Sequence, residues 1–204
     1  KWDGKIPFKH TEKLYIKRSD DFDEDRLAPQ WQWNYQPRKD YFSLTERPGW
    51  LRLKAYRPLE TNNLLKAGNT LTQRTFRKQN NDVTIKMDIS NMQDGQKNGL
   101  CHFSSQHSAI GVVKEEDACY LEYRKNGNIT KGIQIHSEFV WFRTEWGMDG
   151  KSQYYYSLDG DNFLPFGEKY QLTWGNYRGD RIGIYCFNDK KETGSVDVDY
   201  CHYR

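Results

Sequence analysis

The feature that most constrains this chain is an alternation of apolar and polar side chains with a period of two residues. Val83, Ile85, Met87 and Ile89 are apolar, and the residues between them are polar. Successive side chains of a β-strand point to opposite faces, so this period predicts strands with one face on a core and one toward water. The same pattern recurs at Leu51–Ala55, at Ile182–Cys186 and at Val196–Tyr200, where we expect Val196, Val198 and Tyr200 inward and Asp197 and Asp199 outward.

Turn signals separate these alternating runs. Asn126-Gly127 lies between two strand-like segments and is the strongest short-range signal for a β-hairpin. Asp159-Gly160 follows another such segment, and no stretch has the period of an amphipathic helix. The sequence therefore predicts an all-β fold, an antiparallel two-sheet sandwich of the jelly-roll type.

Size and charge restrict the organisation of the chain. Its 204 residues are within the range of one β-sandwich domain, and no linker or repeat divides them. We expect a lead-in segment, or the tail of an upstream linker, at residues 1–12 and a single domain at residues 13–204. The net charge of +3, with 31 basic against 28 acidic residues, argues against nucleic acid as a partner. No apolar stretch is long enough for a membrane span, and we expect no signal peptide within these residues.

The four cysteines have no metal-binding spacing. Cys101, Cys119, Cys186 and Cys201 each lie in a strand-like segment, without a CxxC or a Cys/His finger pattern. We expect buried free thiols, with disulfide pairing as the alternative.

No catalytic constellation is visible. A retaining glycosidase needs two carboxylates about 5 to 5.5 Å apart, which on one strand face gives a Glu-x-Asp-x-x-Glu spacing. The acidic groups at residues 20–25 and 115–117 lack that spacing, and the five histidines form no metal pattern. A nucleophile elbow, a phosphate loop and a dinucleotide fingerprint are also missing. We therefore expect no enzymatic activity of the chain on its own; a stand-alone glycoside hydrolase is the weaker alternative.

Several ordered motifs carry a family resemblance. The string DFDEDRLAPQWQWN at residues 21–34 and the closing VDVDYCHY at residues 196–203 resemble the C-terminal concanavalin A-like domain of family 43 glycoside hydrolases. Between them, in order, come SLTERPGWLRL, NTLTQR, NGL, VWFR, QYYYSLDGDNF and RIGIY. The resemblance extends from about residue 20 to the end of the chain.

This resemblance implies an accessory role. Family 43 enzymes are β-xylosidases and α-L-arabinofuranosidases, in which such a sandwich follows a five-bladed β-propeller that holds the catalytic carboxylates. The expected function is binding of xylan or arabinoxylan, packing on the propeller, or both. The alternative is a purely structural domain that shapes the propeller active site. The family context also implies a periplasmic or extracellular location.

Aromatic and polar side chains are the candidate sugar contacts, since rings stack on sugars and Arg, Asn and Gln bind hydroxyls. In VWFR, an inward Val140 and Phe142 would turn Trp141 and Arg143 outward together. Tyr155 is expected to be exposed, between the inward-facing Tyr154 and Tyr156.

Three further candidates come from other segments. In QWQWN, Trp31 and Trp33 share one face while Gln32 and Asn34 share the other, and the sequence does not decide which pair is buried. Arg74 ends a strand-like run without a local partner. For Trp33 the alternative is core or interdomain packing, and for Arg74 and Arg143 it is cross-sheet salt bridging.

A structural calcium ion is the single cofactor that the sequence raises, and no cofactor is required. Asp21, Asp23 and Asp199 can supply hard oxygen ligands between the first and last strands, with ordinary surface charge as the alternative. The Asp-rich loop at residues 157–163 is not an EF-hand, because the twelfth position from Asp159 is Tyr170.

Overall fold

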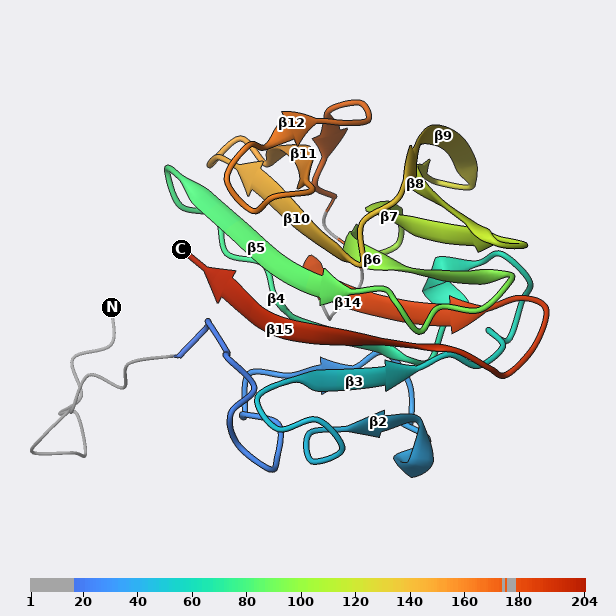
Figure 1. Cartoon of the computed structure of the whole chain (residues 1–204). Helices are drawn as coiled ribbons and strands as arrows, with labels where there is room; N and C mark the ends of the chain where they lie inside the picture. Colours follow the sequence, from blue (N-terminus) through green and yellow to red (C-terminus); the bar gives the residue numbers. More distant parts are fainter. Residues whose placement is uncertain (1–16, 174, 176–178) are drawn as a thin grey trace, which may run out of the picture.

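The computed structural model describes residues 17–173, 175 and 179–204. Over these residues the chain forms two antiparallel sheets and two short 3₁₀ helices (Figure 1). The predicted all-β, antiparallel two-sheet sandwich is confirmed. The expected lead-in segment at residues 1–12 lies outside the described residues.

Sheet A has eight strands among the described residues, in the order β12-β11-β10-β5-β15-β3-β2, with β13 paired to β11. Strands β5 and β15 lie at its centre and cross the front of Figure 1. The bounds are β2 Phe42–Ser43, β3 Leu51–Lys54, β5 Asn81–Asp88, β10 Phe139–Trp146, β11 Lys151–Ser157, β12 Leu164–Pro165, β13 Tyr170–Gln171 and β15 Ser195–Tyr203.

Sheet B has seven strands in the described part of the chain, in the order β1-β4-β14-β6-β7-β8-β9. The bounds are β1 Gln32–Trp33, β4 Thr70–Arg74, β6 Gln96–Phe103, β7 His107–Glu115, β8 Ala118–Lys125, β9 Asn128–Ile135 and β14 Arg181–Asn188. The 3₁₀ helices are η1 Lys39–Tyr41 and η2 Leu64–Lys66.

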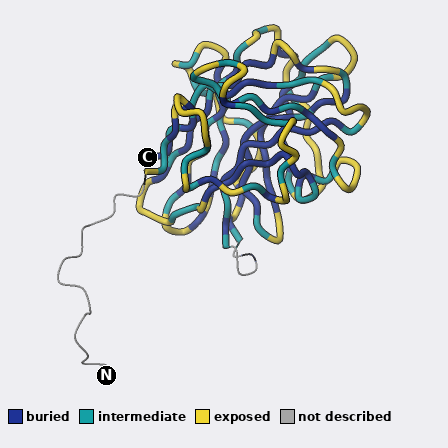
Figure 2. Tube along the Cα trace, turned by 90° about the horizontal axis from the view of Figure 1, so that it is seen from below, coloured by how far each residue is buried: buried dark blue, intermediate teal, exposed yellow. Residues whose placement is uncertain are grey.

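The main core lies between the two sheets, and the alternation accounts for it. Val83, Ile85 and Met87 of β5 and Val140 and Phe142 of β10 are fully buried in one cluster. Figure 2 shows the buried segments inside the sandwich and the exposed residues at its turns. Burying apolar surface of this kind contributes about 25 cal/mol per Å², and this is the main stabilisation of the fold.

The hairpin predicted at Asn126-Gly127 joins β8 to β9. Asn126 and Gly127 have φ values of 49° and 90°, the left-handed conformation that the tightest hairpin turns require.

One expectation about β15 is wrong. Tyr200 does not share a face with Val198, because a β-bulge shifts the register between these two residues. Val198 lies opposite the buried Met87, whereas Tyr200 lies opposite the outward-facing Lys86. The extra residue of a bulge turns the following side chains to the other face. Tyr200 and His202 therefore point outward, and Cys201 and Tyr203 point into the core.

The four cysteines are free, and Cys119 is the half-buried one while the others are buried. Cys186 belongs to the main core, whereas Cys101 belongs to a second apolar cluster on the opposite face of sheet B. Burial raises the pKa of Cys186 to about 12, which keeps this thiol protonated.

That second cluster covers the outer face of sheet B. Leu64 and Ala67, from the segment around η2, pack on strand residues of β6, β7 and β14. The strand members are Cys101, Phe103, Ala109, Tyr185 and Phe187. The chain thus buries part of the outer side of sheet B with its own loop.

Candidate functional site

The outer face of sheet A is the candidate site, and strand register builds it. One cross-strand row runs His202, Thr84, Arg143 and Tyr155, from β15 through β5 and β10 to β11. Side chains directly opposite one another in an antiparallel pair lie on the same face. Trp141 and Arg143 therefore point outward together, as the sequence predicts, and Tyr155 joins them.

A second row places aromatic rings beside the first. Tyr200, Lys86 and Trp141 lie opposite one another on β15, β5 and β10. Two further rings lie nearby, because Phe139 begins β10 and Trp50 packs against it with ring centroids 6.5 Å apart. We call this surface the aromatic face and define it by its half-buried rings, Trp50, Phe139, Trp141, Phe163 and Tyr200.

Cations lie over several of these rings. The Arg47 guanidinium lies 3.8 Å from the centroid of Trp50. The Lys86 ammonium is 5.1 Å from the ring centroid of Trp50, 5.2 Å from that of Phe139 and 5.7 Å from that of Trp141. Attraction between a cation and the face of a ring contributes about 0.5–1 kcal/mol at exposed sites. Lys86 therefore holds three rings around one charge.

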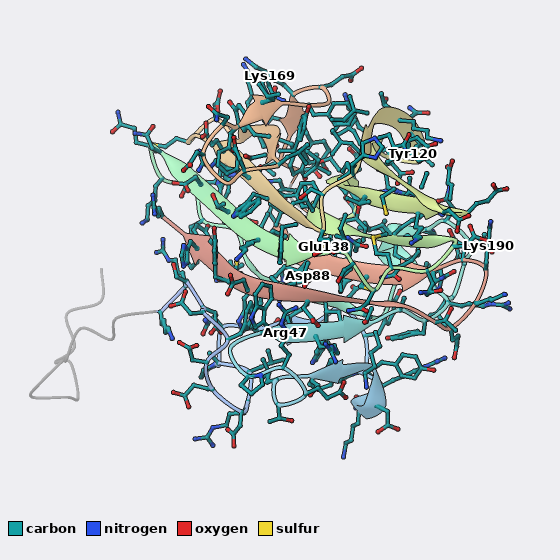
Figure 3. All side chains as sticks on the ribbon, in the orientation of Figure 1. Arg47, Asp88, Tyr120, Glu138, Lys169 and Lys190 are labelled. Atoms are coloured by element: carbon teal, nitrogen blue, oxygen red, sulfur yellow. The ribbon has the colours of Figure 1, made fainter. Side chains whose placement is uncertain are left out.

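Most charges on this surface are paired. Arg47 donates to Asp88 at 2.7 Å and to Asp197 at 2.9 Å, and Figure 3 shows Arg47 beside Asp88. Arg52 also binds Asp197, at 2.7 Å, and Lys86 binds Asp199 at 2.7 Å. The network leaves few polar groups free for sugar hydroxyls.

The Asp88 carboxylate shows the balance of forces in this network. Burial raises the pKa of Asp88, but hydrogen bonds from Ser90 and Arg47 together lower it by more. The pKa therefore lies below its usual value. Asp88 therefore stays ionised at neutral pH and keeps Arg47 in place.

Arg143 differs from the other cations of the face. Its Nε donates a hydrogen bond to Thr84 Oγ1 at 3.0 Å, and its guanidinium lies 3.6 Å from the centroid of the Phe163 ring. Among the described residues no carboxylate pairs with it. Burial raises the pKa of the adjoining Tyr155, Glu145 adds to the rise, and Arg143 opposes it. The guanidinium is fixed in position but not neutralised.

Trp141 is partly covered by the chain itself. A methyl group placed on Gly160 would come 3.0 Å from the Trp141 ring, so the β11–β12 turn lies against one side of the indole. Burial raises the pKa of Tyr200, and a hydrogen bond with the side chain of Trp141 opposes this rise. The indole is thus half covered, which leaves less ring face for a sugar.

The other three predicted sugar contacts lie on sheet B, away from this face. Trp33 packs toward the core against Phe42, with ring centroids 4.7 Å apart. Asn34 is also buried, under the η2 segment, where it donates to the carbonyls of Leu65 and Ala67 at 3.0 and 3.2 Å. Arg74 is exposed at the end of β4, opposite Arg181. The structure therefore does not bring the six predicted contacts together in one site.

The three aspartates predicted as calcium ligands have other partners or positions. Asp21 Oδ1 lies 2.7 Å from His202 Nε2, and Asp199 binds Lys86. Asp23 lies in the loop before β1, beside Gly49. The described residues contain no group of three or more His, Cys, Asp or Glu side chains able to hold a metal ion. Nor do they contain a helix long and apolar enough to cross a membrane.

Sheet B carries a hollow of about 640 Å³ on its outer side, next to the apolar cluster. Its wall includes Asn62, Tyr120, Glu122 and Lys131, and Figure 3 shows Tyr120 on β8, far from Arg47. Lys131 lies 3.5 Å from the centroid of the Tyr120 ring. A larger, open polar cleft of about 1040 Å³ lies beside η1 and the β14–β15 turn.

Sequence reasoning missed several members of the aromatic face. Phe139 has the same parity as Trp141 and Arg143 on β10, so the alternation itself was a usable signal. The sequence held no such signal for the other two rings. A loop brings Trp50 to the face, and a bulge turns Tyr200 outward.

Comparisons with known proteins agree with the fold. Residues 19–204 match the family model described as the β-xylosidase C-terminal concanavalin A-like domain. A β-xylosidase of Formosa agariphila is 35% identical over 207 residues, which cover 92% of this chain and 35% of that protein. The chain thus spans about a third of the length of this curated relative.

Two solved structures extend this comparison. A bifunctional GH43-CE protein of Bacteroides eggerthii superposes with a TM-score of 0.82 at 30% identity, covering 91% of this chain and 25% of that one. A GH43 glycoside hydrolase described as displaying endo-xylanase and exo-arabinofuranosidase activity superposes with a TM-score of 0.83 at 24% identity. That match covers 97% of this chain and 42% of the other and supports the fold alone.

Proposed function

The chain belongs to the β-xylosidase C-terminal concanavalin A-like domain family, and from this membership we propose that it packs on the catalytic propeller of a family 43 glycoside hydrolase. It acts there as a non-catalytic accessory domain, and the aromatic face is its docking surface. The observation that carries the proposal is a row of half-buried rings whose neighbouring cations, Arg143 apart, are already paired. Burial of aromatic and Arg-rich surface is typical of protein interfaces, with rings and arginines as the energetic anchors.

The path of the chain supports the same face. Asp20 pairs with Cys201 of β15, Ser19 contacts Tyr203, and Asp21 reaches the outward-facing His202. The first described residues therefore run beside the row that contains Arg143. Because the described chain begins beside the aromatic face, this face is the nearest surface for a catalytic domain that precedes it in a longer enzyme.

Footprinting tests this docking directly. The catalytic domain of the parent enzyme, added as a separate polypeptide, is expected to slow oxidative labelling of Trp50 and Trp141 severalfold. Tyr120, on sheet B, serves as the internal control and should label at an unchanged rate. Equal labelling of Trp50 with and without the catalytic domain would rule out docking by this face.

Xylan binding is a second candidate function, and the hollow on sheet B favours it. An aromatic ring, an amide and a carboxylate, from Tyr120, Asn62 and Glu122, line one hollow of about 640 Å³. Sugar sites combine a ring for the C–H face with a few convergent polar groups for the hydroxyls. This placement differs from the residues expected from the sequence, of which none lines the hollow.

Calorimetric titration with xylohexaose tests the second candidate. Tyr120→Ala should weaken binding by about fivefold, because stacking on this half-buried ring contributes about 1 kcal/mol. Trp141→Ala is the matched control on the other sheet and should leave the affinity unchanged. The opposite result would move sugar binding to the aromatic face.

A polysaccharide-degrading role also favours a periplasmic or extracellular location.

A further inference from the structure

The cations of the aromatic face fall into two classes. Arg47, Arg52 and Lys86 each have at least one carboxylate partner at 2.7 Å. Arg143 has none among the described residues, although Asp and Glu side chains are plentiful on this side of the molecule. Its one hydrogen bond to the described residues goes to the neutral hydroxyl of Thr84.

The guanidinium of Arg143 is also fixed in place with N–H donors available for a partner. A guanidinium has five N–H donors, and Thr84 takes only the one on Nε. The four donors on the two Nη atoms remain available. Stacking on Phe163 at 3.6 Å fixes the plane of the guanidinium, so little side-chain entropy is lost when a planar acceptor binds.

Docking makes the lack of a carboxylate costly. A guanidinium that loses water at an interface without gaining an acceptor is strongly destabilising. From this geometry we infer that the docking partner presents a carboxylate side chain to Arg143, in a two-pronged ion pair that fixes the register of the interface. The inference rests on the proposed docking function and names the chemistry that the partner must supply.

A protein carboxylate suits the site better than an acidic sugar. Arg143 lines neither the hollow on sheet B nor the polar cleft beside η1. It lies on a strand surface among Trp141, Tyr155 and Phe163. Such a surface matches another folded domain, whereas small-ligand sites are typically concave.

Binding of the separate catalytic domain, measured by calorimetry at two salt concentrations, tests the inference. Arg143→Gln is expected to weaken binding by about 30-fold or more, the usual loss when one member of a buried charge pair is removed. Arg143→Lys should lower the affinity for the catalytic domain by about tenfold, because an ammonium keeps the charge but not the two-pronged geometry. Arg143→Gln should also reduce the salt dependence of the affinity. Arg74→Gln, an exposed arginine on sheet B, is the matched control and should bind as the wild type does.

The outcomes separate the inference from the function it rests on. If the catalytic domain does not bind the wild type, both are overturned. If it binds, and Arg143→Gln binds equally well, only the inference is overturned. A third titration compares glucuronic-acid-substituted with unsubstituted xylo-oligosaccharide. The acidic sugar could bind more tightly in a way that depends on Arg143, while domain docking stays unchanged in Arg143→Gln. That result would show that Arg143 binds a polysaccharide carboxylate, and it would overturn the inference of a protein carboxylate.

Discussion

The outer faces of the two sheets differ in how far loops of the same chain cover them. On sheet B, the segment around η2 folds over the strands and buries a second apolar cluster that includes Leu64, Tyr185 and Phe187. Beside this cluster lies an ion pair between Glu122 and Arg124, whose side chains are only 6% and 3% exposed. On sheet A, no loop in the described part of the chain covers the central rings to that extent, and Trp50, Phe139 and Trp141 remain half-buried.

This difference separates surface that serves the fold from surface left for a partner. The cover on sheet B contributes to the stability of the chain alone, because its apolar contacts are complete. The central rings of the aromatic face gain less from their own chain, since they remain half-buried and their partly exposed Lys86–Asp199 pair contributes only about 0–1 kcal/mol. Substitutions on the two faces should therefore differ in their effect on the free energy of unfolding.

The largest effect is expected from Arg124→Met on sheet B. The change leaves the Glu122 carboxylate buried without its partner and removes a hydrogen bond to Asn62 Oδ1 at 2.7 Å. Breaking a buried pair in this way costs about 3–5 kcal/mol, measurable by urea unfolding at pH 7. The double variant Glu122→Leu/Arg124→Met should recover most of the loss, because apolar residues of similar volume replace the pair. A single variant as stable as the wild type would show that this pair does not hold the cover in place.

A smaller loss is expected from Leu64→Ala, which opens a cavity under the η2 segment. Leu64 is 1% exposed in the sheet B cluster, and such truncations cost about 2–5 kcal/mol. Trp50→Ala on the aromatic face should cost no more than about 1 kcal/mol, since that side chain is only partly buried. Equal losses in thermal unfolding would remove the distinction between the two faces.

Acid should weaken the sandwich through sheet B. Burial lowers the pKa of His102 to about 3, and burial together with Arg124 lowers that of His107 to about 4. Below pH 6.5, the histidine pKa in the unfolded chain, the unfolded chain binds protons that the folded chain does not bind. The free energy of unfolding therefore falls as the pH falls. Each histidine contributes about 1.4 kcal/mol per pH unit in this window.

The measurement is the slope of unfolding free energy between pH 5 and 6.5, above the range where carboxylates titrate. His102→Gln should roughly halve the slope, because Gln can still bond Thr144 and carries no titrating ring. His202→Gln, the exposed histidine of the aromatic face, is the control and should change the slope less. A slope untouched by His102→Gln would show that His102 is not kept neutral by burial.

The fold was predictable where neighbouring residues carry the information. The alternation at residues 83–89 and the Asn126-Gly127 turn gave β5 and the β8–β9 hairpin, because period and turn chemistry are local properties. The bulge in β15 was not predictable, since it exists only relative to the register with β5. The assignment of Tyr200 to the core failed for that reason.

The site was predictable in part for the same reason. Trp141 and Arg143 follow from the parity of β10, and their outward orientation is confirmed, while their role stays a prediction. Trp33 and Asn34 could not be decided, because their burial depends on Phe42 and on the distant η2 segment. The outward position of Arg143 follows from the alternation, but its lack of a carboxylate partner depends on side chains from β5 and the β11–β12 turn that are distant in sequence.

The smallest effect is expected from Lys86→Met, and it is the sharpest test of the contrast between the faces. Lys86 pairs with Asp199 and lies within 5.7 Å of three ring centroids, so its contacts place it at the centre of the aromatic face. The pair is nevertheless 24% and 29% exposed, and methionine keeps the apolar stem that packs on the rings. The free energy of unfolding should therefore fall by less than about 1 kcal/mol, and the difference should shrink in 1 M salt, where charges are screened within about 3 Å. Docking of the catalytic domain should weaken in the same variant, because Asp199 would then be buried without its cation. A stability loss above about 2 kcal/mol, insensitive to salt, would instead make the aromatic face part of the domain's own structure.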